Sequence, residues 1–232
     1  MTKKRTKPVG GAEIAVYTCI LPHTFESLEA PYYINEDKSQ VHYWAITDAQ
    51  QGVHPWWDQV VVRDMSLTSR RDLQKYKLLS HKYLPEYKYT VWVDGSVRLK
   101  VDPVALIDLL KESGKPVAFG VHPWRDCSYE EGKVCAGFKQ NNAKLITEQL
   151  KRYRKEGLPK HFGLCASSFF VRDNQDPKAC EFFDLWLEET MSGSHRNQIS
   201  FGFAAWKTKI DILWWQIVWG DNEYWKHDRK KR

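Results

Sequence analysis

An aspartate stands directly after a run of β-forming residues. The run is Tyr89–Val93, and Asp94, Gly95 and Ser96 follow it. A carboxylate at the tip of a buried strand, beside a glycine that lets a ligand approach the backbone, can hold a metal–diphosphate group. The same residues also fit an ordinary Asp-Gly turn between two strands. This segment alone leaves both interpretations open.

A second group of reactive side chains lies between His122 and Glu131. This segment contains a histidine, an arginine, an aspartate, a cysteine, a tyrosine and two glutamates. His122 is a candidate ligand for phosphate or metal. The candidate catalytic carboxylates are Asp126, Glu130 and Glu131, since a carboxylate can take the proton from an attacking hydroxyl group. The alternative is an exposed loop whose charges are solvated.

The pattern of apolar residues predicts the elements that must position these groups. Strands are predicted at 12–20, 41–48, 57–63, 89–93, 116–120 and 163–172. Helices are predicted at 68–83, 103–110, 142–155, 177–190 and 199–206, and the segment 122–132 is predicted to be irregular. The alternation predicts an α/β fold, with a single domain and a mostly parallel central sheet flanked by helices.

Ligands of such sheets bind at the carboxyl ends of the strands. We therefore expect Thr18, Asp48 and Asp94 to lie close together at one edge of the sheet. In the helix predicted at 68–83, Thr68 or Ser69 can form the N-cap. Lys77 and His81 are four residues apart and would share one face of that helix.

The composition of the 232 residues is that of an ordinary globular domain, with 42% hydrophobic and 28% charged residues. The net charge of +6 belongs to the two ends, because residues 1–7 carry +4 and residues 226–232 carry +4, which leaves −2 for the rest. We therefore expect a flexible basic arm at 1–11, a domain at 12–225 and a basic tail at 226–232. Such tails are solvated, or make peripheral contacts with anionic surfaces.

The sequence gives no indication of secretion or of a membrane span. No apolar run reaches the roughly 18 residues of a membrane-spanning helix, and the basic N-terminus lacks the apolar core of a signal peptide. The five cysteines are widely spaced, with no Cys-x-x-Cys pair, so neither a zinc site nor a disulfide framework is indicated. A cytoplasmic location is expected.

Several segments, in this order, resemble one known family. They are Tyr17–Ile20, Arg70–Tyr87, Trp92–Gly95, His122–Glu131 and Arg196–Phe201. The chain resembles, over about residues 12–207, glycosyltransferase-like proteins first catalogued as a domain of unknown function. Their plant members are linked to mucilage and turgor, and bacterial and viral relatives exist. The family is similar to GT-A glycosyltransferases, which bind a nucleotide-sugar on a Rossmann-like sheet.

The resemblance implies roles for the strand ends and the basic helix. In GT-A enzymes an Asp-x-Asp motif binds the divalent cation that bridges the donor diphosphate, and Asp94-Gly95-Ser96 occupies that place here. Asp94 and Ser96 are thus the implied ligands of Mn²⁺ or Mg²⁺, although a hydroxyl is a weaker ligand than a carboxylate. The residues implied to bind the nucleotide-sugar are Tyr17, Thr18, Asp48, Arg71, Lys77, Asp94, Gly95, His122 and Arg125. Arg71 and Lys77 could also neutralise the diphosphate without a metal.

The segment Arg196-Asn197-Gln198 departs from the related enzymes, which often carry Asp-Gln there. Asn197 and Gln198 are implied to lie near the anomeric carbon of the donor. An amide can bind sugar hydroxyls but cannot act as a base or as a carboxylate nucleophile. The carboxylate's task would then pass to Asp94 or to the segment 126–131.

The resulting function hypothesis is transfer of a sugar, as a hexosyl or pentosyl group, from a nucleotide-sugar such as a UDP-sugar to a hydroxyl acceptor such as a glycan. One alternative is a metal-dependent hydrolase of the ceramidase type, built on the segment 122–131. Another is a non-catalytic protein that binds nucleic acid or anionic surfaces through its tails, against which the −2 body argues. Four C-terminal tryptophans could stack on acceptor sugars or seal the sheet: Trp214, Trp215, Trp219 and Trp225.

Overall fold

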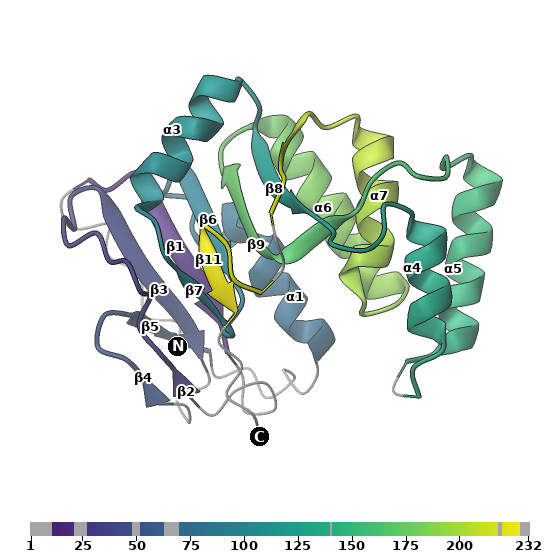
Figure 1. The fold of residues 1–232 in the computed structure, drawn as a ribbon, viewed down its shortest axis with the longest axis horizontal. Helices are drawn as coiled ribbons and strands as arrows, with labels where there is room; N and C mark the ends of the chain where they lie inside the picture. The colour runs from purple at the N-terminus through teal and green to yellow at the C-terminus, as the bar shows by residue number, and fades with distance from the viewer. Residues whose placement is uncertain are drawn as a thin grey trace.

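A seven-stranded sheet runs through the middle of the molecule, with helices on both of its faces (Figure 1). The computed structural model describes residues 11–20, 27–47, 52–62, 70–139, 141–217 and 220–227. In spatial order the strands are β10 (Ile212–Trp215), β8 (Val117–Val121), β9 (Cys165–Asp173), β6 (Tyr89–Val93), β1 (Ile14–Cys19), β3 (Val41–Thr47) and β5 (Asp58–Val61). All neighbouring pairs are parallel except those of β9, which runs antiparallel to β6 and β8. The predicted mixed α/β fold with a mostly parallel sheet is confirmed.

The central strands are buried on both faces, as their continuous apolar runs predict. All six residues of β1 are buried, and Val16 pairs with Tyr43 of β3 on one side and Val91 of β6 on the other. Successive side chains of a strand point to opposite faces. Trp92 therefore joins one apolar core and Val93 the other.

Seven helices are described, and three of them begin with a side-chain cap. They are α1 (Arg70–Leu78), α2 (Ser80–Tyr83), α3 (Pro103–Ser113), α4 (Ser128–Ala136), α5 (Ala143–Glu156), α6 (Pro177–Ser192) and α7 (Asn197–Thr208). Asp102, Asn142 and Asp176 each accept a hydrogen bond from a backbone N–H of the first turn. These caps supply partners for otherwise unpaired donors, which explains why α3, α5 and α6 begin within a residue of their predicted positions.

The helices divide between the two faces of the sheet. Side chains of α1, α6 and α7 fill one core, and those of α3 fill the other. A third, smaller core joins α4 and α5 to α7, beside the sheet (Figure 1). Within the described residues, no helix has both the length and the apolar character required to cross a membrane.

Two short sheets complete the described architecture. β7 (Val97–Leu99) pairs antiparallel with β11 (Trp225–His227), and β2 (Ser27–Leu28) pairs with β4 (Gly52–Val53). β11 includes Lys226 and His227, so the described fold extends two residues into the segment assigned to the basic tail. Residues 1–10 and 228–232 lie outside the described residues. Trp215 and Trp225 are buried in the core, which fits their role in sealing the sheet, and Trp219 lies outside the described residues.

Two predicted elements were wrong. The single helix at 68–83 is two helices, α1 and α2, which are interrupted at Leu79, and Thr68 and Ser69 lie outside the described residues. Lys77 and His81 therefore do not share a face. Lys77 bonds to Asp94, whereas His81 bonds to Asp184 and Arg172.

The segment predicted to be irregular, 122–132, contains the first half of α4. Its exposed polar residues hide a buried face formed by Tyr129 and Cys135, which packs in the third core. Gly132 looks like a loop residue in the sequence, but it is a contact point between α4 and α5. A Cβ atom at Gly132 would lie 2.5 Å from Cδ1 of Leu150, so any other residue there would displace the Leu150 side chain. The burial of Tyr129 and Cys135 in the third core therefore stabilises a helix where the polar sequence predicts a loop.

Candidate functional site

A cavity of about 960 Å³ opens at the carboxyl ends of the parallel strands. Cys19 from the end of β1, Asp94 after β6 and His122 after β8 all line it. Because β9 runs the other way, its early residues Ser167 and Ser168 lie at the same edge and also line the cavity. This is the edge at which parallel sheets bind their ligands.

Asp94 is held at the cavity wall by three neighbours. Its Oδ1 atom accepts hydrogen bonds from Lys77 Nζ at 2.8 Å and from the Trp92 indole at 2.7 Å, and its backbone N–H donates to the Ser168 carbonyl. The Asp94 carbonyl accepts from the Val97 N–H, which closes the turn between β6 and β7. Asp94 therefore forms the turn between β6 and β7, and it also lines the cavity.

Ser96 meets a side chain from the far end of the chain. Ser96 Oγ lies 3.2 Å from Nε2 of His227, because β11 pairs His227 with Val97. The residues that could hold a metal here are one carboxylate, one hydroxyl and one imidazole. This mixed set fits Mn²⁺, which accepts nitrogen ligands, better than Mg²⁺, which prefers oxygen.

A polar floor without charge lies beside Asp94. The Asn197 side-chain amide donates to Gln74 Oε1 at 2.8 Å and accepts from the Ser167 hydroxyl at 3.2 Å. Ser168 is buried, and its hydroxyl has no hydrogen-bond partner in the described part of the chain. Amides and hydroxyls in this arrangement suit the hydroxyl groups of a bound sugar.

Glu131 is the second carboxylate of the cavity. It is buried and accepts a hydrogen bond from Arg125 Nε at 2.5 Å and one from the Cys135 thiol at 3.1 Å. Burial raises the pKa of Cys135 to about 11, with the Glu131 hydrogen bond acting in the same direction, so the thiol stays protonated. Cys135 is therefore the donor in its hydrogen bond to Glu131.

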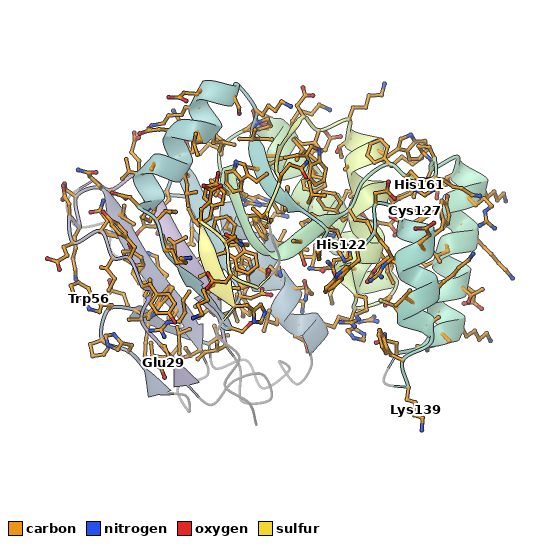
Figure 2. The ribbon with its side chains drawn as sticks, viewed as in Figure 1. Glu29, Trp56, His122, Cys127, Lys139 and His161 are labelled. Atoms are coloured by element: carbon orange, nitrogen blue, oxygen red, sulfur yellow. The ribbon has the colours of Figure 1, made fainter. Side chains whose placement is uncertain are left out.

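His122 lies between the central sheet and α4 (Figure 2), and its backbone partners fix its protonation. Its Nδ1 accepts from the N–H groups of Trp124 and Arg125, so the proton of the neutral ring is on Nε2. That Nε2 lies 3.9 Å from Glu131 Oε2. Burial lowers the pKa of His122, which keeps the ring neutral. His122 is thus a hydrogen-bond donor facing the cavity.

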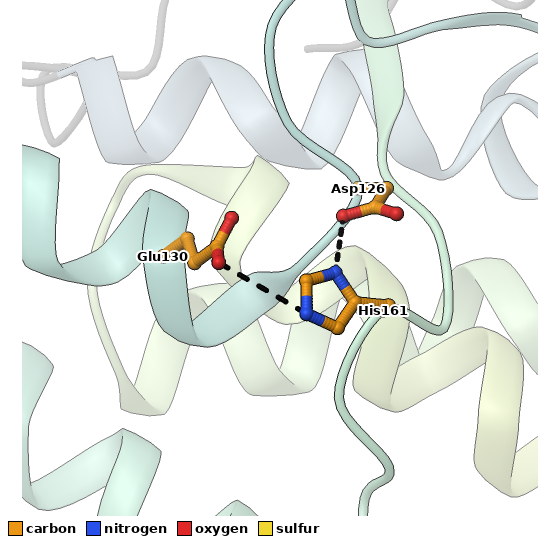
Figure 3. Close-up of side chains that lie close together, drawn as sticks. All are labelled: Asp126, Glu130 and His161. Atoms are coloured by element: carbon orange, nitrogen blue, oxygen red, sulfur yellow. Dashed lines mark hydrogen bonds and ion pairs between the residues drawn. The ribbon is translucent and has the colours of Figure 1, made fainter.

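Asp126 and Glu130 lie outside the cavity, in a cluster with His161 (Figure 3). Nδ1 of His161 lies 2.7 Å from Asp126, and its Nε2 lies 4.0 Å from Glu130. All three side chains are exposed, and hydrogen bonding to Asp126 raises the pKa of His161. Adjacent glutamates are thus separated: Glu131 faces the cavity and Glu130 faces solvent.

Nine of the residues selected from the sequence line the cavity together. They are Lys77, Asp94, Gly95, Ser96, His122, Arg125, Glu131, Asn197 and Gln198. Three others have structural contacts away from it. The Tyr17 hydroxyl donates to the Lys77 carbonyl, Arg71 donates to the carbonyls of Met191 and Gly193, and Thr18 is fully buried inside β1. Asp48 lies outside the described residues.

Sequence reasoning missed several cavity residues. Gln74 precedes Lys77 by three positions on α1, a spacing that could have indicated it. Ser167 and Ser168 are a polar pair within an apolar strand, which is also a recognisable signal. For His227 there was no signal, since it stands among the basic residues of the C-terminus.

Comparison with known proteins agrees with this geometry. The model of the TOD1/MUCI70 glycosyltransferase-like domain matches residues 30–228. The chain belongs to this family.

Two relatives from Arabidopsis thaliana are similar to this TOD1/MUCI70 domain. "Probable hexosyltransferase MUCI70" is 29% identical over 169 residues, which cover 68% of this chain and 29% of that protein. "Alkaline ceramidase TOD1" is 30% identical over 84 residues, which cover 35% of this chain and 18% of that protein. The chain thus matches less than a third of the length of either relative.

Proposed function

We propose that this TOD1/MUCI70 domain transfers a sugar from a nucleotide-sugar, such as a UDP-sugar, to a hydroxyl group of an acceptor such as a glycan. The observation that carries the proposal is the Lys77–Asp94 pair, which stands at the carboxyl end of β6 in the wall of a large cavity. A ligand diphosphate needs cationic partners there, and a GT-A-like sheet presents them at this edge. The similarity to a probable hexosyltransferase supports the same reaction class.

In this proposal the donor lies along the cavity from Ser96 to Asn197. The diphosphate lies near Lys77 and Asp94, and the donor sugar lies over the polar floor. Asp94 and His227 would hold a Mn²⁺ ion, whose positive charge would stabilise the departing diphosphate. Lys77 contributes a second positive charge, and its attraction to the leaving group strengthens as that group gains negative charge.

We propose Glu131 as the base, because it and Asp94 are the carboxylates among the described lining residues, and this proposal assigns Asp94 to the diphosphate site. Glu131 takes the acceptor hydroxyl proton as the acceptor oxygen bonds to the anomeric carbon. The bond from that carbon to the diphosphate oxygen breaks, and its electron pair leaves with the nucleoside diphosphate. The Nε2–H of His122 and the Nε–H of Arg125 orient the carboxylate.

The test is binding, followed by turnover. Thermal stability is measured with a panel of nucleoside diphosphates and nucleotide-sugars, each with and without Mn²⁺, because a ligand of the native state at a hundred times its Kd adds about 2.7 kcal/mol. A shift with one nucleotide, followed by release of that nucleoside diphosphate when acceptor is added, would establish the transferase. No shift with any nucleotide would refute the proposal.

The hydrolase alternative finds less support in the described residues. The group of three possible metal ligands, Asp126, Glu130 and His161, is exposed and does not line the cavity. A catalytic zinc site keeps three protein ligands and an open position facing a substrate pocket. The alternative of surface binding through the tails rests on residues outside the described part of the chain, apart from Lys226 and His227.

A further inference from the structure

The cavity has an apolar edge over α4 that we call the α4 rim, formed by Trp124, Val134 and Phe138. All three line the cavity, yet they are 68%, 42% and 43% exposed. Large apolar side chains that gather at the mouth of a polar cavity indicate a binding surface. Aromatic rings of this kind suit the C–H face of a sugar ring, which is apolar on one side and carries hydroxyls at its edge.

Arg196 stands beside this rim and has no carboxylate partner in the described part of the chain. Its guanidinium lies 5.8 Å from the centre of the Phe138 ring, and its Nε is buried without a hydrogen-bond partner. The other charged lining residues are paired, Lys77 with Asp94 and Arg125 with Glu131. Among the described lining residues, one positive charge is therefore without a carboxylate partner, and it lies at the α4 rim.

The start of α7 adds to this positive potential. Arg196 is the N-cap residue of α7, and the first turn of this twelve-residue helix contains no acidic residue. The N-terminus of a helix carries a partial positive charge that favours anions. The buried Nε of Arg196, which has no hydrogen-bond partner among the described residues, provides an independent indication of a ligand.

Contacts connect Arg196 with both the polar floor and the neighbours of the proposed base. They run from Asp94 to Ser168 through the backbone, and from Ser167 to Asn197 through side chains. Arg196 is the next residue along. The positive charge of Arg196 acts against the rise that burial causes in the pKa of the Cys135 thiol, and Cys135 is bonded to Glu131. Arg196 thus adjoins Asn197 of the polar floor in the chain and interacts with the thiol that contacts the proposed base.

We propose that Arg196 and the α4 rim form an acceptor subsite for a sugar that carries a negatively charged substituent. The sugar ring stacks on Trp124 or Phe138, and its anionic group binds the guanidinium in two charge-assisted hydrogen bonds. This inference rests on the proposed transferase function and adds to it the charge of the acceptor. It also gives a role to the two exposed aromatic residues that flank α4, Trp124 and Phe138.

The test measures binding of oligosaccharides by titration calorimetry, so turnover is not required. The probes are a tetrasaccharide of alternating glucuronate and N-acetylglucosamine, and the same tetrasaccharide after reduction of its carboxyl groups. We expect the acidic probe to bind about tenfold to a hundredfold more tightly, as expected for a hydrogen bond to a charged group. Salt should weaken this preference. Equal binding of the two probes, or binding of neither, would overturn the proposal.

Variants locate the subsite. Arg196→Gln should abolish the preference for the acidic probe, Arg196→Lys should retain part of it, and Trp124→Ala should weaken both probes. The matched controls are Arg154→Gln on the exposed face of α5 and Trp56→Ala, which lies on the opposite side of the molecule from α4 (Figure 2). If Arg196→Gln weakens nucleotide-sugar binding and leaves the oligosaccharide unaffected, Arg196 serves the donor and the proposal is wrong.

Binding of nucleotide-sugars and binding of acidic oligosaccharides are measured separately on the same protein. Nucleotide-sugar binding without an acidic preference would leave the transferase proposal intact and remove the acceptor subsite. Acidic oligosaccharide binding without any nucleotide-sugar binding would support the subsite and remove the transferase. Thermal melting of each variant shows whether a loss of binding reflects a loss of folding.

Discussion

The Lys77 ammonium lies 2.8 Å from Oδ1 of Asp94, and the two side chains differ sharply in exposure. The Lys77 side chain is 5% exposed and that of Asp94 is 34% exposed. The ammonium also lies 5.2 Å from the centre of the Trp92 ring, whose indole donates to the same carboxylate oxygen. A buried cation is thus held against a carboxylate that solvent and ligands can reach. Removing either charge should affect stability and function differently.

Asp94→Asn should reduce kcat/KM by about a hundredfold or more, since it removes the charge that organises the diphosphate site. It should also cost about 1–3 kcal/mol of stability, because the Lys77 ammonium loses its counter-ion. Adding Lys77→Met should restore the stability and leave the activity low. Urea unfolding and initial rates would separate the two effects, with Asp108→Asn on α3 as the exposed control. A double variant with normal turnover would remove this pair from the mechanism.

Glu131→Gln and Glu130→Gln form a matched pair on one helix. Glu131→Gln should lower kcat by about a hundredfold to ten-thousandfold, the usual contribution of a general base. Glu130→Gln should leave the rate near wild type, because this side chain lies outside the cavity. Equal rates for the two variants would rule out Glu131 as the base.

Asn197→Ala should raise the KM for the donor and destabilise the fold by about 1–3 kcal/mol, because Gln74 and Ser167 lose their buried partner. Asn197→Asp keeps an acceptor for Ser167 but brings a carboxylate oxygen to face Gln74 Oε1. We expect a lower rate for it as well. A faster Asn197→Asp enzyme would show that the floor works better with the carboxylate found in related enzymes.

His227→Ala should weaken activation by Mn²⁺ by about tenfold or more, if His227 is a ligand as proposed. The matched control is His161→Ala, which removes the histidine of the exposed cluster with Asp126 and Glu130. Rates are measured over a Mn²⁺ titration after treatment with a chelator. If the wild-type enzyme is insensitive to chelator, Lys77 rather than a metal stabilises the diphosphate, and the proposed role of His227 is wrong.

His81 should make the protein less stable as the pH falls from about 6.5 to about 4. Burial, with Arg172 nearby, lowers the pKa of His81 from 6.5 to about 4. In this window His81 binds a proton in the unfolded chain but not in the folded protein, so acid favours unfolding. The free energy of unfolding falls by at most about 1.4 kcal/mol per pH unit. His81→Gln should flatten the dependence measured by urea unfolding. Parallel curves for the two proteins would contradict the assignment.

The sequence by itself determined most of the longer elements and part of the cavity wall. Asp102, Asn142 and Asp176 cap helices through local hydrogen bonds, and continuous apolar runs form the buried strands, so both can be predicted from neighbouring residues. The same local logic placed Asp94 at the end of a strand. Lys77 on the helix that precedes this strand was selected through the resemblance to a known family, and it too lines the cavity.

Only the tertiary structure decided which side chains face the cavity together. The antiparallel direction of β9 brings Ser167 and Ser168 to the edge where the parallel strands end, and the pairing of β11 with β7 brings His227 to Ser96. The rotation of α4 against α5 and α7 turns Glu131 inward and leaves Glu130 in solvent. These orientations depend on packing between segments far apart in the chain. The energies of that packing cannot be read from any local pattern of residues.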